Sequence, residues 1–154
     1  MEIERTSKCY AAAQTVLFLL FTAAVFLAPG GYLFTSGGSK TAGNILGAVG
    51  VVLFVLGFAS LRGAIQIAPE PKRGAQLVET GVYRYLRHPI YTGIIFCAIG
   101  LFLRQPTIWV AVAGVIVIIF LFFKARFEEK LLLATYPGYA AYRGRTWGLL
   151  PGLR

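Results

Sequence analysis

Long uncharged, apolar runs divide the chain into four hydrophobic segments separated by short polar or basic stretches. The runs cover residues 11–28, 41–61, 89–103 and 105–123. A helix that crosses a bilayer needs about 20 apolar residues, with a range of roughly 17–25. The first, second and fourth runs meet this length. The third is short, so it should begin earlier, with Arg87 reaching the interface, or lie tilted in a thinned or protein-lined region. The pattern predicts an all-α, polytopic membrane protein with about four transmembrane helices.

Turn-forming residues separate these runs and predict how the helices are joined. Proline and glycine in residues 29–31, and serine and glycine in residues 36–38, interrupt the chain after the first run. Residues 104–106, Arg-Gln-Pro, leave room only for a tight turn between the third and fourth runs. Those two helices should therefore form an antiparallel hairpin.

Small residues in the second run predict close packing on a neighbouring helix. Gly43-x-x-x-Gly47 is continued by Gly50 and Gly57. Small residues with this kind of spacing let the backbones of two membrane helices approach each other closely.

The composition agrees with a membrane protein. The 154 residues are 57% hydrophobic and 14% charged, whereas a soluble domain of this size carries about 25% charged residues. We interpret residues 1–154 as one integral membrane domain. The net charge of +9 is spread between the apolar runs rather than gathered in one patch. We therefore expect no nucleic-acid partner, and attribute the charge to membrane topology and anionic lipid.

The basic residues also predict an orientation. All 15 except Lys40 and Arg104 fall on one side of the predicted membrane. Because positive residues accumulate in cytoplasmic loops, both termini, residues 62–88 and residues 124–154 should be cytoplasmic. The tail should be a helix that leaves the membrane at Arg126, continues through residues 131–133 and breaks at Pro137-Gly138.

No metal-binding pattern is present in the sequence. The chain has one histidine, His88, and two distant cysteines, Cys9 and Cys97. This set does not make a usual zinc site, and a disulfide between the cysteines is not expected.

Two clusters of polar and aromatic residues carry the candidate chemistry. The first includes Tyr83, Arg87, His88 and Tyr91 at the entrance to the third run, and the second is Arg126-Phe-Glu128-Glu129 just after the fourth. Ionisable groups at membrane depth are costly to keep, so they are functional candidates by default. The predicted hairpin brings its two outer ends together, and with them the His88 and Glu129 regions.

These side chains suit a ligand that is zwitterionic, aromatic and cationic. A glutamate can pair with an ammonium group, arginine or histidine can hold a carboxylate, and tyrosine rings attract a cationic centre. Pro89 biases His88 away from the helical region. S-adenosylmethionine, which carries an ammonium, a carboxylate, a sulfonium and an adenine, is a good candidate.

The same residues carry a family resemblance. Leu-Val-x-x-Gly-x-Tyr-x-x-x-Arg-His-Pro-x-Tyr, at residues 77–91, is followed by Arg-x-Glu-Glu at 126–129 and a Tyr-x-x-Tyr tail. This arrangement resembles the isoprenylcysteine carboxyl methyltransferases, which are related to the phospholipid N-methyltransferases. The resemblance covers about half of the chain, from Leu77 to Pro151. Ala75-Gln76 departs from it, since prenylcysteine enzymes often have a histidine just before Leu-Val.

The resemblance implies roles for individual residues. Arg126 would face the substrate and orient it. The residues that would line an S-adenosylmethionine pocket at the cytoplasmic face are Leu77, Val78, Tyr83, His88, Pro89, Tyr91 and Glu129, with the adjacent Glu128 as an alternative to Glu129. The tail tyrosines, Tyr136, Tyr139 and Tyr142, fit either this pocket or an interfacial aromatic belt.

The function implied is S-adenosylmethionine-dependent methylation of a lipophilic or lipid acceptor, by carboxyl O-methylation as in the isoprenylcysteine enzymes. Methylation of a phospholipid amine or of a thiol stays open as an alternative. Two other classes also stay open, an NADPH-dependent membrane reductase of the sterol-reductase type and a non-catalytic membrane scaffold. The sequence does not indicate an oligomeric state or a role for the two N-terminal helices.

Overall fold

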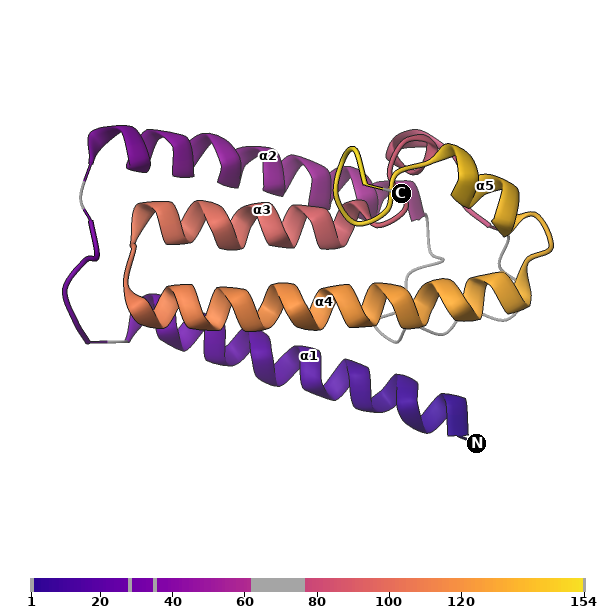
Figure 1. The fold of residues 1–154 in the computed structure, drawn as a ribbon, viewed down its shortest axis with the longest axis horizontal. Coiled ribbons are helices and arrows are strands. Elements are labelled where there is room, and N and C mark those ends of the chain that lie inside the picture. The colour runs from indigo at the N-terminus through magenta and orange to yellow at the C-terminus, as the bar shows by residue number, and fades with distance from the viewer. Residues whose placement is uncertain (1, 28, 35, 62–76, 154) are drawn as a thin grey trace.

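A computed structural model describes residues 2–27, 29–34, 36–61 and 77–153, and every regular element in these ranges is a helix (Figure 1). The predicted all-α fold is therefore confirmed. Arg62, Lys72, Arg73 and the Ala75-Gln76 departure lie outside the described residues. The elements are α1 (Glu2–Phe26), α2 (Gly37–Leu61), the short 3-10 helix η1 (Gly81–Arg84), α3 (Pro89–Arg104), α4 (Ile108–Thr135) and α5 (Tyr139–Arg145).

Three of these helices, α1, α2 and α4, are long and apolar enough to cross a membrane. The chain is thus an integral membrane protein. The 16 residues of α3 measure about 24 Å at the usual helical rise, less than the roughly 30 Å of a bilayer core. A count of four crossings therefore stays a prediction, as does the side of the membrane on which the termini lie.

The third helix does not begin earlier than its apolar run. Pro89 is its first residue and His88 its N-cap, because proline has no backbone N–H and suits the first helical turn. Arg87 lies outside the helix and is only 6% exposed. The prediction that Arg87 reaches from an extended third helix to the membrane interface is therefore wrong.

The fourth helix is longer than its apolar run. It continues through Leu131–Leu133 and ends at Thr135, just before Pro137-Gly138, as the tail pattern predicted. A further helix, α5, follows this break and was not predicted from the sequence.

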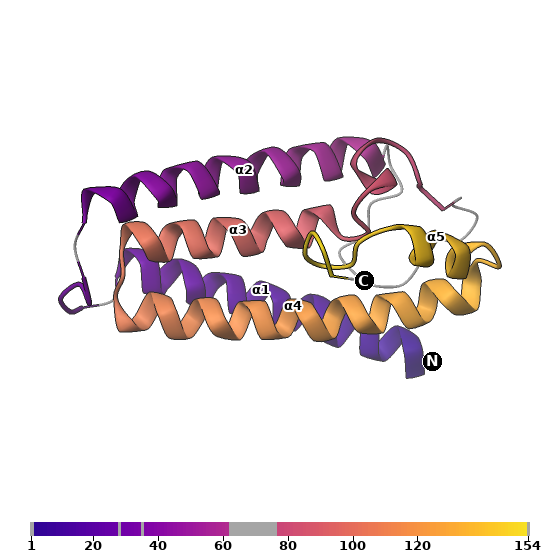
Figure 2. The ribbon, with the colours of Figure 1, turned by 45° about the horizontal axis from the view of Figure 1, so that its top comes forward.

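The long helices run up and down, and α3 lies between α2 and α4 (Figures 1 and 2). The predicted antiparallel hairpin of α3 and α4 is present, with its turn at the end of the bundle opposite α5. Both chain ends lie at the α5 end, together with η1 and the start of α3. The open end of the α3–α4 hairpin, η1 and α5 therefore lie at the same end of the bundle.

Close contact between α2 and α3 holds the start of α3 in position. Gly43, Gly50 and Gly57 are all buried. A Cβ atom added at Gly50 would lie 2.7 Å from the carbonyl oxygen of Gly93, and one at Gly57 would lie 2.9 Å from Ile90 Cγ1. Gly47 differs, because a Cβ atom there would meet nothing within 4 Å. The close packing predicted from the small residues is confirmed, but its glycines face α3 at every seventh position rather than every fourth.

The first helix packs along α4. The Tyr10 ring stacks on Phe127 with centroids 5.0 Å apart, and Phe21 reaches Gly114. The core between the helices is formed by Ile95, Val117 and Leu121, against which Leu17, Phe18 and Phe21 of α1 also pack.

Candidate functional site

The loop before α3 is held by the C-terminal tail. The backbone N–H of Arg87 donates to the Trp147 carbonyl at 2.9 Å, and the N–H of Trp147 donates to the Tyr85 carbonyl at 2.9 Å. These bonds pair residues 85–87 with the segment after α5. Thr92 adds a third link, because its hydroxyl donates to the Leu149 carbonyl at 2.5 Å. The loop that carries Arg87 and His88 therefore has a defined position at the open end of the α3–α4 hairpin.

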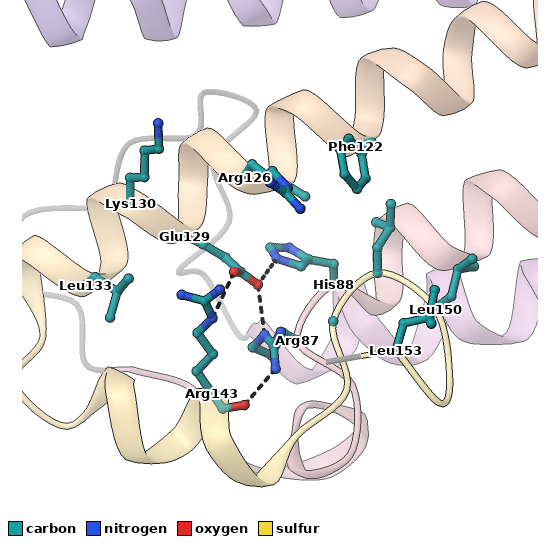
Figure 3. Close-up of a pocket in the computed structure, with 13 residues that line it drawn as sticks. Arg87, His88, Phe122, Arg126, Glu129, Lys130, Leu133, Arg143, Leu150 and Leu153 are labelled. Atoms are coloured by element: carbon teal, nitrogen blue, oxygen red, sulfur yellow. Dashed lines mark hydrogen bonds and ion pairs between the residues drawn. The ribbon is translucent and has the colours of Figure 1, made fainter.

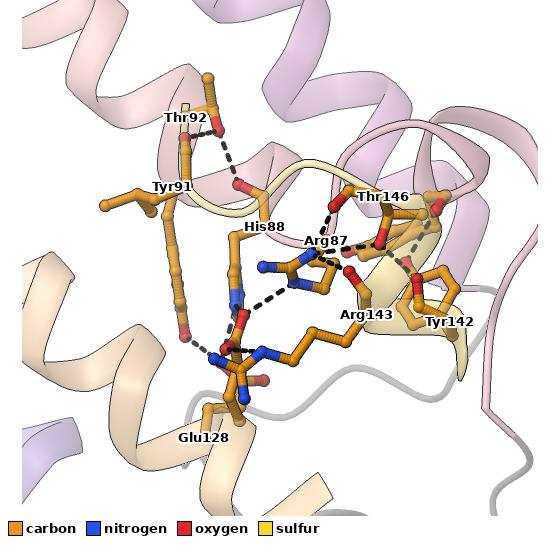
Figure 4. A network of polar contacts seen from close by, with 11 residues as sticks. Arg87, His88, Tyr91, Thr92, Glu128, Tyr142, Arg143 and Thr146 are labelled. Atoms are coloured by element: carbon orange, nitrogen blue, oxygen red, sulfur yellow. Dashed lines mark hydrogen bonds and ion pairs between the residues drawn. The ribbon is translucent and has the colours of Figure 1, made fainter. Parts of the chain in front are cut away.

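Arg87 joins α4 to α5 (Figures 3 and 4). Its Nε donates to Glu129 Oε1 at 2.8 Å, and its Nη1 donates to the carbonyl oxygens of Arg143, at 2.9 Å, and Thr146. A guanidinium group can satisfy several acceptors at once in this way because its donors point in fixed directions. Sequence reasoning placed Arg87 in the motif but gave it no role in the site.

Glu129 lies at the centre of three cationic or potentially cationic groups. Besides Arg87, the His88 Nε2 lies 3.2 Å from its Oε1 and the Arg143 Nε lies 3.4 Å from its Oε2. The Glu129 side chain is 14% exposed. A carboxylate this buried is stable only when it is paired and hydrogen-bonded, and Glu129 meets both conditions. Arg143, whose part in this cluster was not predicted, lies outside the sequence motifs that identified the site.

Glu128 has a different environment from its neighbour. It accepts a hydrogen bond from the Tyr91 hydroxyl at 2.9 Å and lies 3.8 Å from His88 Nδ1, and its side chain is 28% exposed. The His88 and Tyr91 rings are almost parallel, with centroids 5.4 Å apart and an interplanar angle of 6°. The hairpin thus brings His88, Tyr91 and both glutamates together, as the sequence indicated.

A cavity of about 300 Å³ opens beside this cluster (Figure 3). His88, Arg126 and Glu129, three of the predicted site residues, line it. The Arg126 guanidinium lies over the Phe122 ring, 4.6 Å from its centroid. The rest of the lining consists of Arg87, Phe122, Ala125, Lys130, Leu133, Arg143, Gly148, Leu149, Leu150 and Leu153. The cavity therefore has cationic groups beside a wall of leucine side chains.

The other predicted site residues are not among the residues that line this cavity. Leu77 and Val78 are half-buried in the segment before η1. That segment is attached to α5 by an ion pair between Glu79 and Arg145. Tyr83 is buried in η1, and Pro89 is buried at the first turn of α3.

Two of the tail tyrosines are buried, so an interfacial belt does not describe them. Tyr142 donates to the Tyr83 carbonyl at 2.7 Å, and burial raises the pKa of its hydroxyl to about 12 in spite of the nearby Arg87 charge. Tyr139 is 1% exposed, and its hydroxyl has no hydrogen-bond partner within the described part of the chain. Burial, followed by the negative charge of Glu129, raises the pKa of Tyr139 well above its usual value.

The buried Tyr139 hydroxyl has no hydrogen-bond partner among the described residues. Leaving a buried hydroxyl without a partner costs about 1–3 kcal/mol, so such groups call for an explanation. Glu128 is partly exposed, can accept further hydrogen bonds and lies beside the Tyr91 ring. A carboxylate, a spare hydroxyl donor and aromatic rings fit the ammonium and carboxylate groups of S-adenosylmethionine.

Comparison with known families agrees with this chemistry. The sequence model described as phospholipid methyltransferase matches residues 39–138. The chain belongs to this family. The match includes all but the first two residues of α2 and all of η1, α3 and α4, and with them His88, Tyr91, Arg126 and both glutamates. It begins after α1 and ends before α5, so Gln14 and Arg143 lie outside it.

Family membership implies membrane methyltransferase activity, with S-adenosylmethionine as the methyl donor that the family suggests. The recognition made from the motifs is confirmed. A search of individually curated proteins found no match to the chain.

Proposed function

We propose that the protein transfers a methyl group from S-adenosylmethionine to the carboxylate of a lipophilic acceptor at the cytoplasmic membrane face. The observation that carries this proposal is the two-sided character of the cavity. Arg126, Lys130 and Arg143 contribute cationic groups to it, while Leu150 and Leu153 contribute apolar surface. An acceptor with an anionic head and a hydrocarbon tail would satisfy both sides.

The cofactor would be held next to this cavity by the cluster around the two glutamates. Glu128 and the Tyr139 hydroxyl would bind its polar amino-acid end, and His88 and Tyr91 would lie against it, with Tyr83, Leu77, Val78 and Pro89 as the surrounding wall. Glu129 would act mainly through Arg87 and His88, because its own oxygens already contact three partners. The cofactor supplies an electrophilic methyl group.

The protein's own contribution would be to orient the acceptor and exclude water. Arg126 would hold the acceptor carboxylate, for which a guanidinium group offers two parallel hydrogen bonds. Phe122, which lies against the Arg126 guanidinium, would restrict its movement. The leucines of residues 149–153 would cover the acceptor's apolar part.

The arrangement of His88 supports a carboxylate acceptor. Both ring nitrogens face carboxylates, Nε2 toward Glu129 and Nδ1 toward Glu128. Nε2 lies 3.2 Å from Glu129 and Nδ1 lies 3.8 Å from Glu128, so both nitrogens are directed at carboxylates of the protein rather than at an acceptor. A carboxylate is ionised at neutral pH and needs no general base, whereas an amine or thiol acceptor must lose a proton before it reacts.

Methylation of a phospholipid amine is the second candidate, and the family description favours it. A phospholipid also has an anionic group, its phosphate, that the cationic side of the cavity would bind. The two candidates differ in the atom that receives the methyl group and share the cofactor, the cavity and the role of Arg126.

One experiment tests the activity and separates these candidates. The purified protein is incubated with methyl-labelled S-adenosylmethionine and a total lipid extract, and the lipid product is then treated with alkali. A carboxyl methyl ester releases volatile labelled methanol, whereas an N-methylated lipid keeps its label. Release of methanol supports the proposal, and alkali-stable label replaces it with amine methylation. Label that never enters lipid, in protein that binds S-adenosylhomocysteine, argues against both acceptors.

A further inference from the structure

Lys124 connects α1 to the candidate site. It is 1% exposed, although lysine is almost never fully buried without a partner. Its ammonium group donates a hydrogen bond to Gln14 Oε1 on α1. The same ammonium group lies over the ring of Tyr91, 5.4 Å from the ring centroid. Lys124 therefore contacts a polar residue of α1 on one side and a residue of the site on the other.

Tyr91 in turn contacts two of the residues that would hold the cofactor, Glu128 and His88. Its hydroxyl donates to Glu128 at 2.9 Å, and its ring is stacked on His88. The orientation of the Tyr91 ring therefore determines the geometry of its contacts with Glu128 and with His88. A cation over one face of a tyrosine ring is attracted by the ring's electron distribution and favours one ring orientation.

Packing alone does not account for the Gln14–Lys124 pair. Aromatic and aliphatic contacts already hold α1 on α4, among them Tyr10 with Phe127 and Phe21 with Gly114. Burial of the Lys124 ammonium group costs part of its hydration, and well-packed apolar residues often serve as well or better for stability. A lysine kept almost fully buried between helices therefore calls for an explanation beyond packing.

We propose that Gln14 and Lys124 are positioning residues through which α1 orients Tyr91, and with it the His88 and Glu128 contacts. The family match begins at residue 39, so it says nothing of α1. The inference rests on the proposed function only for its effect on cofactor affinity, since the ring orientation itself can be measured without a ligand.

His88 is the only histidine of the chain, and this makes the test direct. Its imidazole signals in an NMR spectrum of the detergent-solubilised protein report the position of the Tyr91 ring, because a stacked ring shifts them. Tyr91→Leu measures the full size of this shift. Spectra recorded over a range of pH separate ring movement from a change in protonation.

We expect Gln14→Leu and Lys124→Met to move the His88 signals toward their Tyr91→Leu position. Gln14→Glu, which keeps an acceptor for the lysine, should leave them unchanged. Thr15→Val is the matched control, because the exposed Thr15 hydroxyl donates within α1, to the Ala11 carbonyl. Unchanged His88 signals in both Gln14→Leu and Lys124→Met would overturn the inference.

Calorimetric binding of S-adenosylhomocysteine provides the functional measurement. Gln14→Leu should weaken it by about tenfold, within the range expected for one cation–π contact, while Gln14→Glu and Thr15→Val retain wild-type affinity. If Gln14→Leu lowers the unfolding temperature together with the affinity, the residue has a role in stability alone, which would contradict the inference. Wild-type protein that binds no S-adenosylhomocysteine would instead contradict the proposed function, and the His88 spectra would still test the positioning role.

Discussion

Arg87 and Glu129 form a largely buried ion pair across 42 positions of sequence, with the arginine Nε 2.8 Å from the glutamate oxygen. The pair joins the loop before α3 to the part of α4 that follows its apolar run. Through the same guanidinium group, the backbone of Arg143 and Thr146 is attached as well. Three segments that meet only in the folded chain are thus held by one side chain, which also lines the cavity.

Arg87→Ala should destabilise the protein strongly. It would leave Glu129 without its closest cation and two backbone carbonyls without a donor, and removal of one partner of a buried pair costs about 3–5 kcal/mol. Arg87→Lys should recover only part of this, because an ammonium group cannot reach acceptors in several fixed directions. The unfolding temperature in detergent measures both effects. Arg84→Ala, at an exposed position three residues earlier, is the control and should be close to neutral, and equal stability of Arg87→Ala and wild type would refute the assignment.

The two adjacent glutamates should respond differently to substitution. Glu128→Gln should weaken S-adenosylhomocysteine binding by about tenfold or more with little change in unfolding temperature, because a charge-assisted hydrogen bond to a ligand is lost. Glu129→Gln should lower both affinity and unfolding temperature, because its three partners lose their shared carboxylate. Calorimetry combined with thermal unfolding separates the two. If Glu128→Gln kept wild-type affinity, the direct contact with the cofactor would have to be assigned to Glu129.

Arg126→Ala should damage turnover and spare cofactor binding. Its guanidinium lines the cavity and lies against Phe122, so its loss removes the group that would orient the acceptor. Misorientation of this kind costs about 100-fold in rate. Arg126→Lys keeps the charge and should lie between Ala and wild type. Rates with the identified acceptor and affinities for S-adenosylhomocysteine provide the comparison, and an equal loss of both would place Arg126 on the cofactor instead.

Tyr139→Phe should weaken cofactor binding without loss of stability. The Tyr139 hydroxyl has no hydrogen-bond partner among the described residues, so its removal breaks no bond to that part of the fold. Tyr142→Phe is the matched comparison and should be destabilising, because the Tyr142 hydroxyl donates to the Tyr83 carbonyl. Calorimetry should show weaker cofactor binding by Tyr139→Phe, and thermal unfolding should show a lower unfolding temperature for Tyr142→Phe. If Tyr139→Phe bound S-adenosylhomocysteine with unaltered affinity, the Tyr139 hydroxyl would not be a cofactor contact.

Gly50→Ala should disturb the contact between α2 and α3, and Gly47→Ala should not. An added Cβ at Gly50 would lie 2.7 Å from a backbone oxygen, closer than real atoms approach, whereas at Gly47 it would meet open space. Overpacking of this kind costs about 1–3 kcal/mol. The unfolding temperatures of the two variants test the difference. Equal values would mean that α2 packs on α3 in another register.

Much of the fold followed from local patterns. Apolar runs predict membrane helices because every backbone polar group in a lipid environment must be satisfied within the segment. A tight turn at residues 104–106 then requires α3 and α4 to be antiparallel, which is enough to bring His88 near Glu129. Pro89 and Pro137-Gly138 mark the start of α3 and the end of the α4 helix through their effects on the backbone.

The tertiary structure decided the partners of the individual side chains. The sequence by itself determined that the protein is an all-α membrane protein of a methyltransferase family and that two motifs meet at one end of a hairpin. It did not distinguish Glu128 from Glu129, or a buried Tyr139 from an interfacial one. It also did not reveal that Arg87 reaches Glu129 or that Gln14 reaches Lys124. Such contacts depend on how each helix is rotated about its axis and how closely its neighbours approach. Those quantities are decided by packing of the whole bundle, as at Gly50 and Gly93, and not by any one segment.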